Sequence, residues 1–352
     1  MKLKRLTALL LSVMLVLSLA ACGGGKDAKD DSADGDLSGK EIIIGNITPV
    51  TGAQAAYGLA ITNSIQLAID EINAAGGILG ATVKLSTKDD QGTPAEAVSG
   101  FNSLLSEGAA AIIGATLSSC TSAITSLADD EGIVLVTPSS TADSITTKDD
   151  YVFRSCFKDS FQGEMVAAYA KDQGWTKAAV LYATGDTYSS GLHDSFVKAA
   201  EKYGIEIVCE QSSSDTGALD FSSQLATIAA SGADVLFAPY YYDAVGPKII
   251  PQAREAGFKG AIMGCDGFDG TQDYTTGDLS AYENVYFTNH YSPEDSSEIV
   301  QSYVKNYTEK YGSESMNALG ALAYDAMYMV KQAIEKAGSI DHEAIRDAMS
   351  GM

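Results

Sequence analysis

Two clusters of hydroxyl residues in the first half of the chain follow short apolar runs, at 116–121 and at 137–141. Unbroken apolar runs of this length are typical of strands buried on both faces of a parallel sheet, whose ligands bind beyond the carboxyl ends of the strands. Ser118 and Ser119 also precede a helical pattern at 121–130, so we expect them to cap a helix whose free N–H groups favour an anion. This pattern predicts a carboxylate site, although ordinary capping and turn chemistry also explains it.

The strand-like segments of the second half end in aromatic and acidic residues. Tyr188 follows the segment 178–183, the run from Tyr240 to Tyr242 follows 235–238, and Asp266 follows 261–264. A cleft with a polar wall and an aromatic, acidic wall matches a small zwitterion with an apolar tail. Two plainer interpretations stay open: the tyrosines pack inside the protein, and Asp266 is a turn residue beside Gly267.

Strand and helix patterns alternate along most of the chain, which predicts an α/β fold with parallel sheets and right-handed crossovers. Because two such sets follow each other, we expect two doubly wound lobes. The expected strands are 41–47, 81–88, 110–114, 132–137, 178–183, 205–209, 235–238, 261–264 and 285–288. The expected helices are 57–75, 94–107, 121–130, 161–173, 191–203, 221–230, 244–256, 296–311 and 317–337.

Composition limits the function classes. The chain has 352 residues and a formal net charge of −23, or −23 − 3 = −26 without Lys2, Lys4 and Arg5, which argues against nucleic acid or an anionic membrane as partner. We find no Gly-x-Ser-x-Gly, no HExxH and no catalytic Cys/His spacing, so we expect no enzyme, no cofactor and no metal site. Disulfides are possible in an exported protein, but the sequence cannot pair Cys120, Cys156, Cys209 and Cys265.

The first 40 residues predict export and anchoring. Residues 1–21 combine a basic start, a short apolar run and small residues before Cys22, as in a signal peptide, and the run is too short to span a bilayer. Leu-Ala-Ala-Cys at 19–22 resembles a bacterial lipoprotein signal, in which the cysteine is lipidated. Residues 22–40 are rich in glycine and aspartate, so we expect a flexible tether.

A series of short motifs covers nearly the whole mature chain. They are Gly-Asn-Ile-Thr-Pro-Val-Thr-Gly at 45–52, Asp-Glu-Ile-Asn-Ala-Ala-Gly-Gly-Ile at 70–78, Lys-Asp-Asp at 88–90, Thr-Pro at 137–138, Phe-Gln-Gly at 161–163, Gln-Ala-Arg-Glu-Ala-Gly at 252–257 and Ala-Leu-Ala-Tyr-Asp at 321–325. In this order they resemble the type I periplasmic binding proteins, in particular the leucine/isoleucine/valine-binding branch of ABC-transporter substrate-binding lipoproteins.

The resemblance implies two lobes that close on a ligand like a Venus flytrap. Residues 41–157 and 289–337 are expected in lobe 1, and residues 158–288 and 338–352 in lobe 2. Three chain crossings, near Phe157, 288–291 and 337–340, are expected to form the hinge. Family members usually add terminal strands to the second lobe, and this sequence stops before them, which raises the interpretation of a truncated C-terminus.

The resemblance also implies roles for individual residues. The ligand's carboxylate and amino group would be held by the first-lobe residues Ser118, Ser139 and Thr141. The second-lobe tyrosines Tyr188 and Tyr241 would close on the ligand, and Asp266 would pair with its ammonium. The side-chain pocket would be lined by Tyr57 and Leu117. Three departures matter: Asp266 replaces a glutamate, Ser139 replaces a small apolar residue, and Gly92 and Leu117 replace a cysteine pair, so we expect no disulfide there.

These features predict the extracytoplasmic solute-binding component of an ABC importer. It would capture a small amino acid by lobe closure, with a branched-chain amino acid favoured, and deliver it to the permease subunits. We expect a monomer anchored through Cys22 to the outer face of the bacterial cell membrane, at the cell surface or in the periplasm. The alternative is a sensor or receptor module for another small ligand, such as an amide or an aromatic amino acid.

Overall fold

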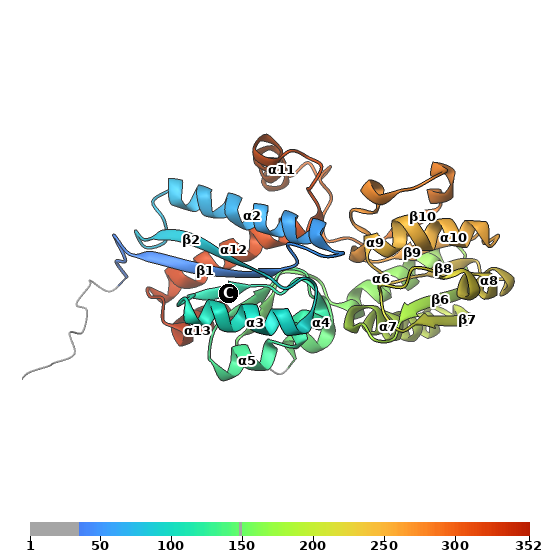
Figure 1. The fold of residues 1–352 in the computed structure, drawn as a ribbon, viewed down its shortest axis with the longest axis horizontal. Coiled ribbons are helices and arrows are strands. Elements are labelled where there is room, and N and C mark those ends of the chain that lie inside the picture. The colour runs from blue at the N-terminus through green and yellow to red at the C-terminus, as the bar shows by residue number, and fades with distance from the viewer. Residues whose placement is uncertain (1–34, 148–149) are drawn as a thin grey trace, which may run out of the picture.

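The computed structural model describes residues 35–147 and 150–352. The expected signal peptide at 1–21 and the expected lipidation site, Cys22, lie outside the described residues. Figure 1 shows two α/β lobes side by side, each built around one sheet. Both sheets have five parallel strands, which confirms the predicted α/β fold with two parallel-sheet lobes.

The first sheet has the strand order β2-β1-β3-β4-β5. Its central strands are buried throughout because helices cover both faces, which explains their unbroken apolar sequences. The strands β3 and β4 are direct neighbours, with Ile112 paired to Leu135, so the two hydroxyl clusters follow adjacent strand ends. The strands are β1 (Glu41–Thr48), β2 (Thr82–Asp89), β3 (Ala111–Ile113), β4 (Leu135–Thr137) and β5 (Val152–Arg154).

The second sheet has the strand order β10-β9-β8-β6-β7. Its inner strands β8 and β9 are again fully buried, and their carboxyl ends lead into the tyrosine run and into Asp266. The strands are β6 (Lys177–Ala183), β7 (Glu206–Ser213), β8 (Val235–Phe237), β9 (Ala261–Gly264) and β10 (Val285–Phe287).

Helices cover both faces of each sheet (Figure 1). In the first lobe, α2 and α12 pack against each other on one side of the sheet and α3 lies on the other side. The first-lobe helices are α2 (Ala55–Ala74), α3 (Pro94–Ser106), α4 (Ser118–Ser122), α5 (Thr125–Asp130), α11 (Glu298–Tyr311), α12 (Ala318–Ala337) and α13 (His342–Ser350). The second-lobe helices are α6 (Asp159–Asp172), α7 (Thr187–Tyr203), α8 (Ser222–Ala230), α9 (Tyr242–Ala244), the π-helical η2 (Val245–Ile249) and α10 (Ile250–Glu255). Single 3₁₀ turns complete the chain: η1 (Asp143–Thr146), η3 (Asp266–Phe268), η4 (Thr271–Tyr274) and η5 (Leu279–Tyr282).

The long helices α7 and α12 have clear end signals in the sequence. The Asn317 side chain accepts from the Gly320 N–H at the start of α12, and Gly338 ends the helix in the left-handed conformation at φ 65°. Asp186 caps α7 in the same way, accepting from the Ser189 N–H at 2.8 Å. Such caps satisfy backbone groups that a helix end leaves free, so they fix where each helix begins and ends.

The first hydroxyl cluster does not cap a helix as expected. Leu117 occupies the N-cap position of α4, with no side-chain cap, and the expected helix 121–130 is split into α4 and α5. Ser118 and Ser119 are the first helical residues, so neither occupies the N-cap position.

The C-terminal segment belongs to the first lobe, which corrects the expected assignment of 338–352 to lobe 2. The helix α13 packs on α12, His342 Nε2 lies 3.1 Å from the Ala109 carbonyl oxygen, and the Arg346 guanidinium covers the Tyr151 ring at 5.0 Å. The expected third crossing at 337–340 is therefore wrong, and the described chain crosses between the sheets near Phe157 and near 288–291 (Figure 1).

The last residues of the expected tether are ordered. Leu37 is buried in the first-lobe core, and its N–H donates to the Leu79 carbonyl at 2.8 Å. The lone leucine in a polar stretch supplies the apolar contact, so residues 35–40 belong to the first lobe and the expected flexible range 22–40 was too long.

Candidate functional site

A small cavity lies between the strand ends of the two lobes. Its volume is about 10 Å³, which is room for about one water molecule and far below the roughly 300–1,000 Å³ typical of small-molecule pockets, so its walls must move apart to admit a ligand. The structure brings all eight predicted residues to this region, and seven of them line the cavity, with Thr141 outside the lining. The lining residues are Tyr57, Thr116, Leu117, Ser118, Ser139, Tyr188, Tyr241, Asp266, Gly267 and Leu319.

The hydroxyls of the first-lobe wall differ in what they can offer a ligand. Ser118 Oγ accepts from the Ala142 N–H at 3.3 Å, so its own proton can go to an anion. Ser139 Oγ donates to the Thr116 carbonyl at 2.9 Å, so it can only accept a further bond. The first hydroxyl therefore suits a carboxylate, whereas the second suits an ammonium group.

Thr141 lies beside a buried carboxylate that the sequence interpretation did not include. The Asp159 N–H donates to the Thr141 carbonyl at 2.9 Å. Among the described residues, Thr141 Oγ1 and both carboxylate oxygens of Asp159 lack a hydrogen bond of normal geometry. Burial raises the pKa of Asp159 well above its usual value, the Thr141 hydroxyl opposes this shift, and the charge of Asp266 adds to it. Beside Thr141 there is thus a second carboxyl group, which burial favours in its neutral form and which a cationic group nearby would favour in its charged form.

Asp266 is held by three side chains. Its Oδ1 accepts from Gln162 Nε2 at 2.9 Å and from the Tyr188 hydroxyl at 3.1 Å, and its Oδ2 lies 3.2 Å from His290 Nε2. A carboxylate offers about four lone-pair sites, so one acceptor position remains for a ligand. The side chain is 4% exposed and among the described residues makes no bond within its own turn, which contradicts the interpretation of Asp266 as a plain turn residue.

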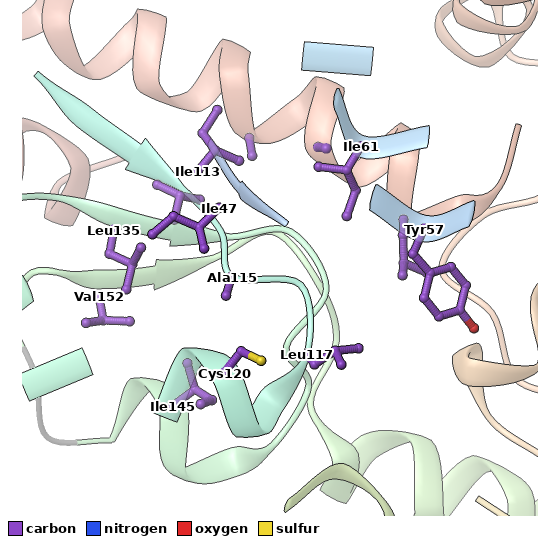
Figure 2. Close-up of a cluster of buried hydrophobic side chains, with 14 of the residues drawn as sticks. Ile47, Tyr57, Ile61, Ile113, Ala115, Leu117, Cys120, Leu135, Ile145 and Val152 are labelled. Atoms are coloured by element: carbon purple, nitrogen blue, oxygen red, sulfur yellow. The ribbon is translucent and has the colours of Figure 1, made fainter. Parts of the chain in front are cut away.

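Three tyrosines form the aromatic part of the cavity. The rings of Tyr188 and Tyr241 stack with centroids 5.0 Å apart, and Tyr57 meets Tyr241 edge-on at 6.5 Å. Burial raises the pKa of each phenol well above its usual value, and neighbouring carboxylates add to the shift, so all three stay neutral donors. In Figure 2 the Tyr57 ring points away from the isoleucine cluster of the first-lobe core.

The other two residues of the tyrosine run do not line this cavity. The hydroxyls of Tyr240 and Ser213 lie 2.8 Å apart within the second lobe. The Tyr242 hydroxyl donates to the Ala53 carbonyl at 3.0 Å, in the first lobe. Of the three tyrosines, Tyr241 therefore lines the cavity, Tyr240 lies inside the second lobe, and Tyr242 joins the two lobes.

The lobes are in direct contact around the cavity, so the structure is closed. The Tyr57 hydroxyl donates to the Gly267 carbonyl at 2.7 Å, and Gln54 Nε2 donates to Asp243 at 3.0 Å. The Ala318 N–H, at the start of α12, donates to Asp269 at 2.7 Å. These contacts enclose the cavity, and a ligand can enter only when they separate.

The backbone after β9 passes very close to its neighbours. A Cβ at Gly267 would lie 2.7 Å from both the Tyr188 hydroxyl and the Tyr240 carbonyl oxygen, and a Cβ at Gly264 would lie 2.1 Å from the Phe268 ring. Both positions require glycine, since real Cβ atoms do not approach this closely. The absence of side chains here lets Asp266 and Gly267 reach the cavity wall.

Sequence reasoning missed several residues of the site. Most of them lie in or next to the chain crossings between the lobes. Gln162 and Asp159 lie three residues apart at the start of α6, and His290 lies in the second crossing. The Phe-Gln-Gly motif was a usable signal for Gln162, because the motif directly follows the first crossing. Nothing in the spacing of His290 connects it to Asp266, 24 residues earlier. Thr116, Gly267 and Leu319 also line the cavity without having been predicted.

Within the described residues, no group of three or more His, Cys, Asp and Glu residues could hold a metal ion. Cys120, Cys156, Cys209 and Cys265 are free thiols. Gly92 does adjoin Leu117, since a Cβ on it would lie 3.4 Å from Leu117 Cδ1. No helix of the described part is both long and apolar enough to cross a membrane.

Comparison with known proteins agrees with this geometry. Residues 41–352 match the family model described as periplasmic binding protein. The chain is 32% identical to the Leu/Ile/Val-binding protein homolog 3 of Brucella melitensis biotype 1, over 86% of this chain and 81% of that protein.

Two solved structures are similar over most of their length. The leucine binding protein LivK of Thermotoga maritima is 33% identical, with a TM-score of 0.80 over 88% of this chain and 87% of that chain. The branched-chain amino acid transporter substrate binding protein LivJ of Streptococcus pneumoniae, in complex with isoleucine, is 31% identical, with a TM-score of 0.79 over 88% of each chain.

Proposed function

Because the chain belongs to the periplasmic binding protein family, we propose that it is the extracytoplasmic solute-binding component of an ABC importer for branched-chain amino acids. The observation that carries the proposal is the cavity itself, where Asp266 with one open acceptor position faces Ser118 with a proton to donate. The names of the relatives as leucine-, isoleucine- and valine-binding proteins support the same ligand class. They also agree with a binding role and not with an enzyme.

The proposed ligand pose follows from the charges of the wall. The ammonium group binds Asp266, and the Ser139 oxygen is available as a second acceptor. The carboxylate binds the Ser118 hydroxyl and the backbone N–H groups next to it. The aliphatic side chain lies against Tyr57 and Leu117, which are both buried. Each charge then has a partner, which is required because burying an unpaired charge costs several kcal/mol.

Replacing Asp266 with Asn tests this assignment, because the change removes the charge and keeps the size. A charge-assisted hydrogen bond contributes about 1.5–3 kcal/mol, so binding of L-leucine should weaken by roughly ten- to a hundredfold. Isothermal titration calorimetry with leucine, isoleucine and valine measures this change. Asp220→Asn is the matched control, since Asp220 is exposed on the second lobe and bonds only Ser222.

The outcome separates the assignment of Asp266 from the ligand class. Unchanged leucine affinity in Asp266→Asn would show that Asp266 does not bind the ammonium group of the ligand. If the wild type binds none of the three amino acids but binds a neutral amide or an aromatic amino acid, the protein serves another ligand, as a sensor module would. Mass spectrometry of ligand retained through purification identifies that ligand directly.

A lipid anchor would keep the protein close to a membrane permease. We propose that the exported chain is lipidated at Cys22, acts as a monomer and is held at the outer face of the cell membrane by the acyl chains and the polar segment that follows. The sequence Leu-Ala-Ala-Cys at 19–22 supports this anchor.

A further inference from the structure

We infer that His290 is a positioning residue for ligand binding: it orients the Asp266 carboxylate and connects it to both chain crossings between the lobes. The inference rests on the proposed function, because Asp266 is there the partner of the ligand's ammonium. His290 lies in the second crossing, and its side chain is 1% exposed. Its Nε2 lies 3.2 Å from Asp266 Oδ2, and its Nδ1 lies 3.4 Å from the backbone nitrogen of Phe157, in the first crossing.

The two contacts of the ring determine its tautomer. Nδ1 accepts a hydrogen bond from the Phe157 N–H, so the neutral ring must carry its proton on Nε2. Nε2 then donates to Asp266 Oδ2. The Phe157 ring covers the imidazole with centroids 5.1 Å apart, so the histidine is fixed both by its hydrogen bonds and by packing.

A second link to the crossing runs through Gln162. Its Nε2 donates to Asp266 Oδ1, and its Oε1 accepts from the Thr288 hydroxyl at 2.8 Å and from the Asp266 N–H at 3.2 Å. Gln162 therefore fixes one carboxylate oxygen, and His290 fixes the other. Without His290, Oδ2 has no donor among the described residues, and the carboxylate is held only at Oδ1, by Gln162 and Tyr188.

This arrangement ties ligand recognition to lobe closure. When the lobes move, the two crossings change their backbone angles, and Phe157 and His290 belong to different crossings. In the closed structure this hydrogen bond is made and Asp266 is held in place for the ligand. A carboxylate that is already oriented binds without an ordering cost, which is the usual gain from preorganisation.

Two substitutions separate the two hydrogen bonds of His290. The amide of Gln places an N–H group near the position of Nε2, so His290→Gln keeps the donor to Asp266 and loses the acceptor for Phe157. The amide of Asn places an oxygen near the position of Nδ1, so His290→Asn keeps the acceptor and loses the donor. We expect L-leucine binding within about threefold of the wild type for His290→Gln and at least about tenfold weaker for His290→Asn. His342→Asn, on the far side of lobe 1, is the control and should bind as the wild type does.

Equal leucine affinity in His290→Asn and the wild type, or equal losses in both His290 variants, would overturn the inference. Nuclear magnetic resonance of the wild type provides a test that needs no variant to fold. Only three histidines are present, and long-range ¹H–¹⁵N spectra should show His290 as the Nε2–H tautomer. The Nδ1–H tautomer would refute the proposed contact. If the wild type binds no leucine, isoleucine or valine, the proposed function fails, whereas the tautomer still decides whether His290 donates to Asp266.

Discussion

Asp90 offers the sharpest prediction on stability, because it is a buried acid with an incomplete set of partners. Its side chain is fully buried, Oδ1 accepts from the Gly92 N–H at 2.9 Å, and Oδ2 has no partner among the described residues. Burial raises the pKa of Asp90 to about 6, against the opposing effect of the Gly92 bond. We therefore expect Asp90→Asn to stabilise the protein at neutral pH, since the amide keeps the Gly92 bond and carries no charge.

The sign and size follow from the pKa shift. The pKa is higher in the folded state than the usual value of 3.8, so folding favours the protonated acid, and wild-type stability falls as pH rises from about 4 to about 6. A shift of about two units corresponds to about 3 kcal/mol. The variant's advantage in free energy of unfolding should thus be near zero at pH 4, grow between pH 4 and 6, and level off at up to about 3 kcal/mol above pH 6.

Urea unfolding followed by circular dichroism at pH 4, 5, 6 and 7 measures this difference, with equal m-values as the check on the unfolding model. Asp89→Asn is the neighbouring control. Partial burial raises the pKa of Asp89, but hydrogen bonds from Thr51, Gln91 and Val50 outweigh burial and lower the pKa below its usual value. Asp89→Asn should therefore destabilise the protein at neutral pH. A constant or negative effect of Asp90→Asn across pH 4–7 would show that Asp90 is ionised at no cost in the folded protein.

Three further predictions concern anchoring and closure. Cys22→Ser should move the protein from membranes to the soluble exported fraction, and a wild type found wholly in the soluble fraction would exclude lipid anchoring. Small-angle X-ray scattering should show a smaller radius of gyration with saturating leucine than without ligand, and an unchanged value with ligand bound would count against hinge closure. Tyr57→Phe removes the 2.7 Å bond to the Gly267 carbonyl across the lobes. Binding of leucine, isoleucine and valine should therefore weaken by a similar factor of about fivefold. A loss confined to one amino acid would indicate that the Tyr57 hydroxyl contacts the ligand instead of Gly267.

The sequence predicted most of the fold because the elements carry strong local signals. Fully apolar strands such as β3 and β8 and long capped helices such as α12 are recognisable from composition and end residues alone. The position of α13 was not predictable in this way. Its apolar residues fit a helix on either lobe, and packing on α12 decides between them.

Which residues lie at the cavity was predictable where they follow a strand and less so where chain crossings contribute. Ser118, Tyr241 and Asp266 follow strand ends, so the rule for parallel sheets placed them near the cavity. His290 comes from the second crossing, and Asp159 comes from the start of the helix that follows the first crossing. No sequence period encodes their contacts, because these contacts join segments that are far apart in the sequence.

The two glycines at the end of β9 and just beyond it have a consequence for how this site can evolve. Because neither Gly264 nor Gly267 leaves space for a Cβ, single substitutions cannot reshape this stretch of the second lobe without displacing Tyr188, Tyr240 or Phe268. Leu117 and Ser139 on the first lobe are ordinary side chains that line the same cavity. New ligand preferences should therefore arise through mutations on the first-lobe wall, while the loop that carries Asp266 keeps its shape across changes of ligand.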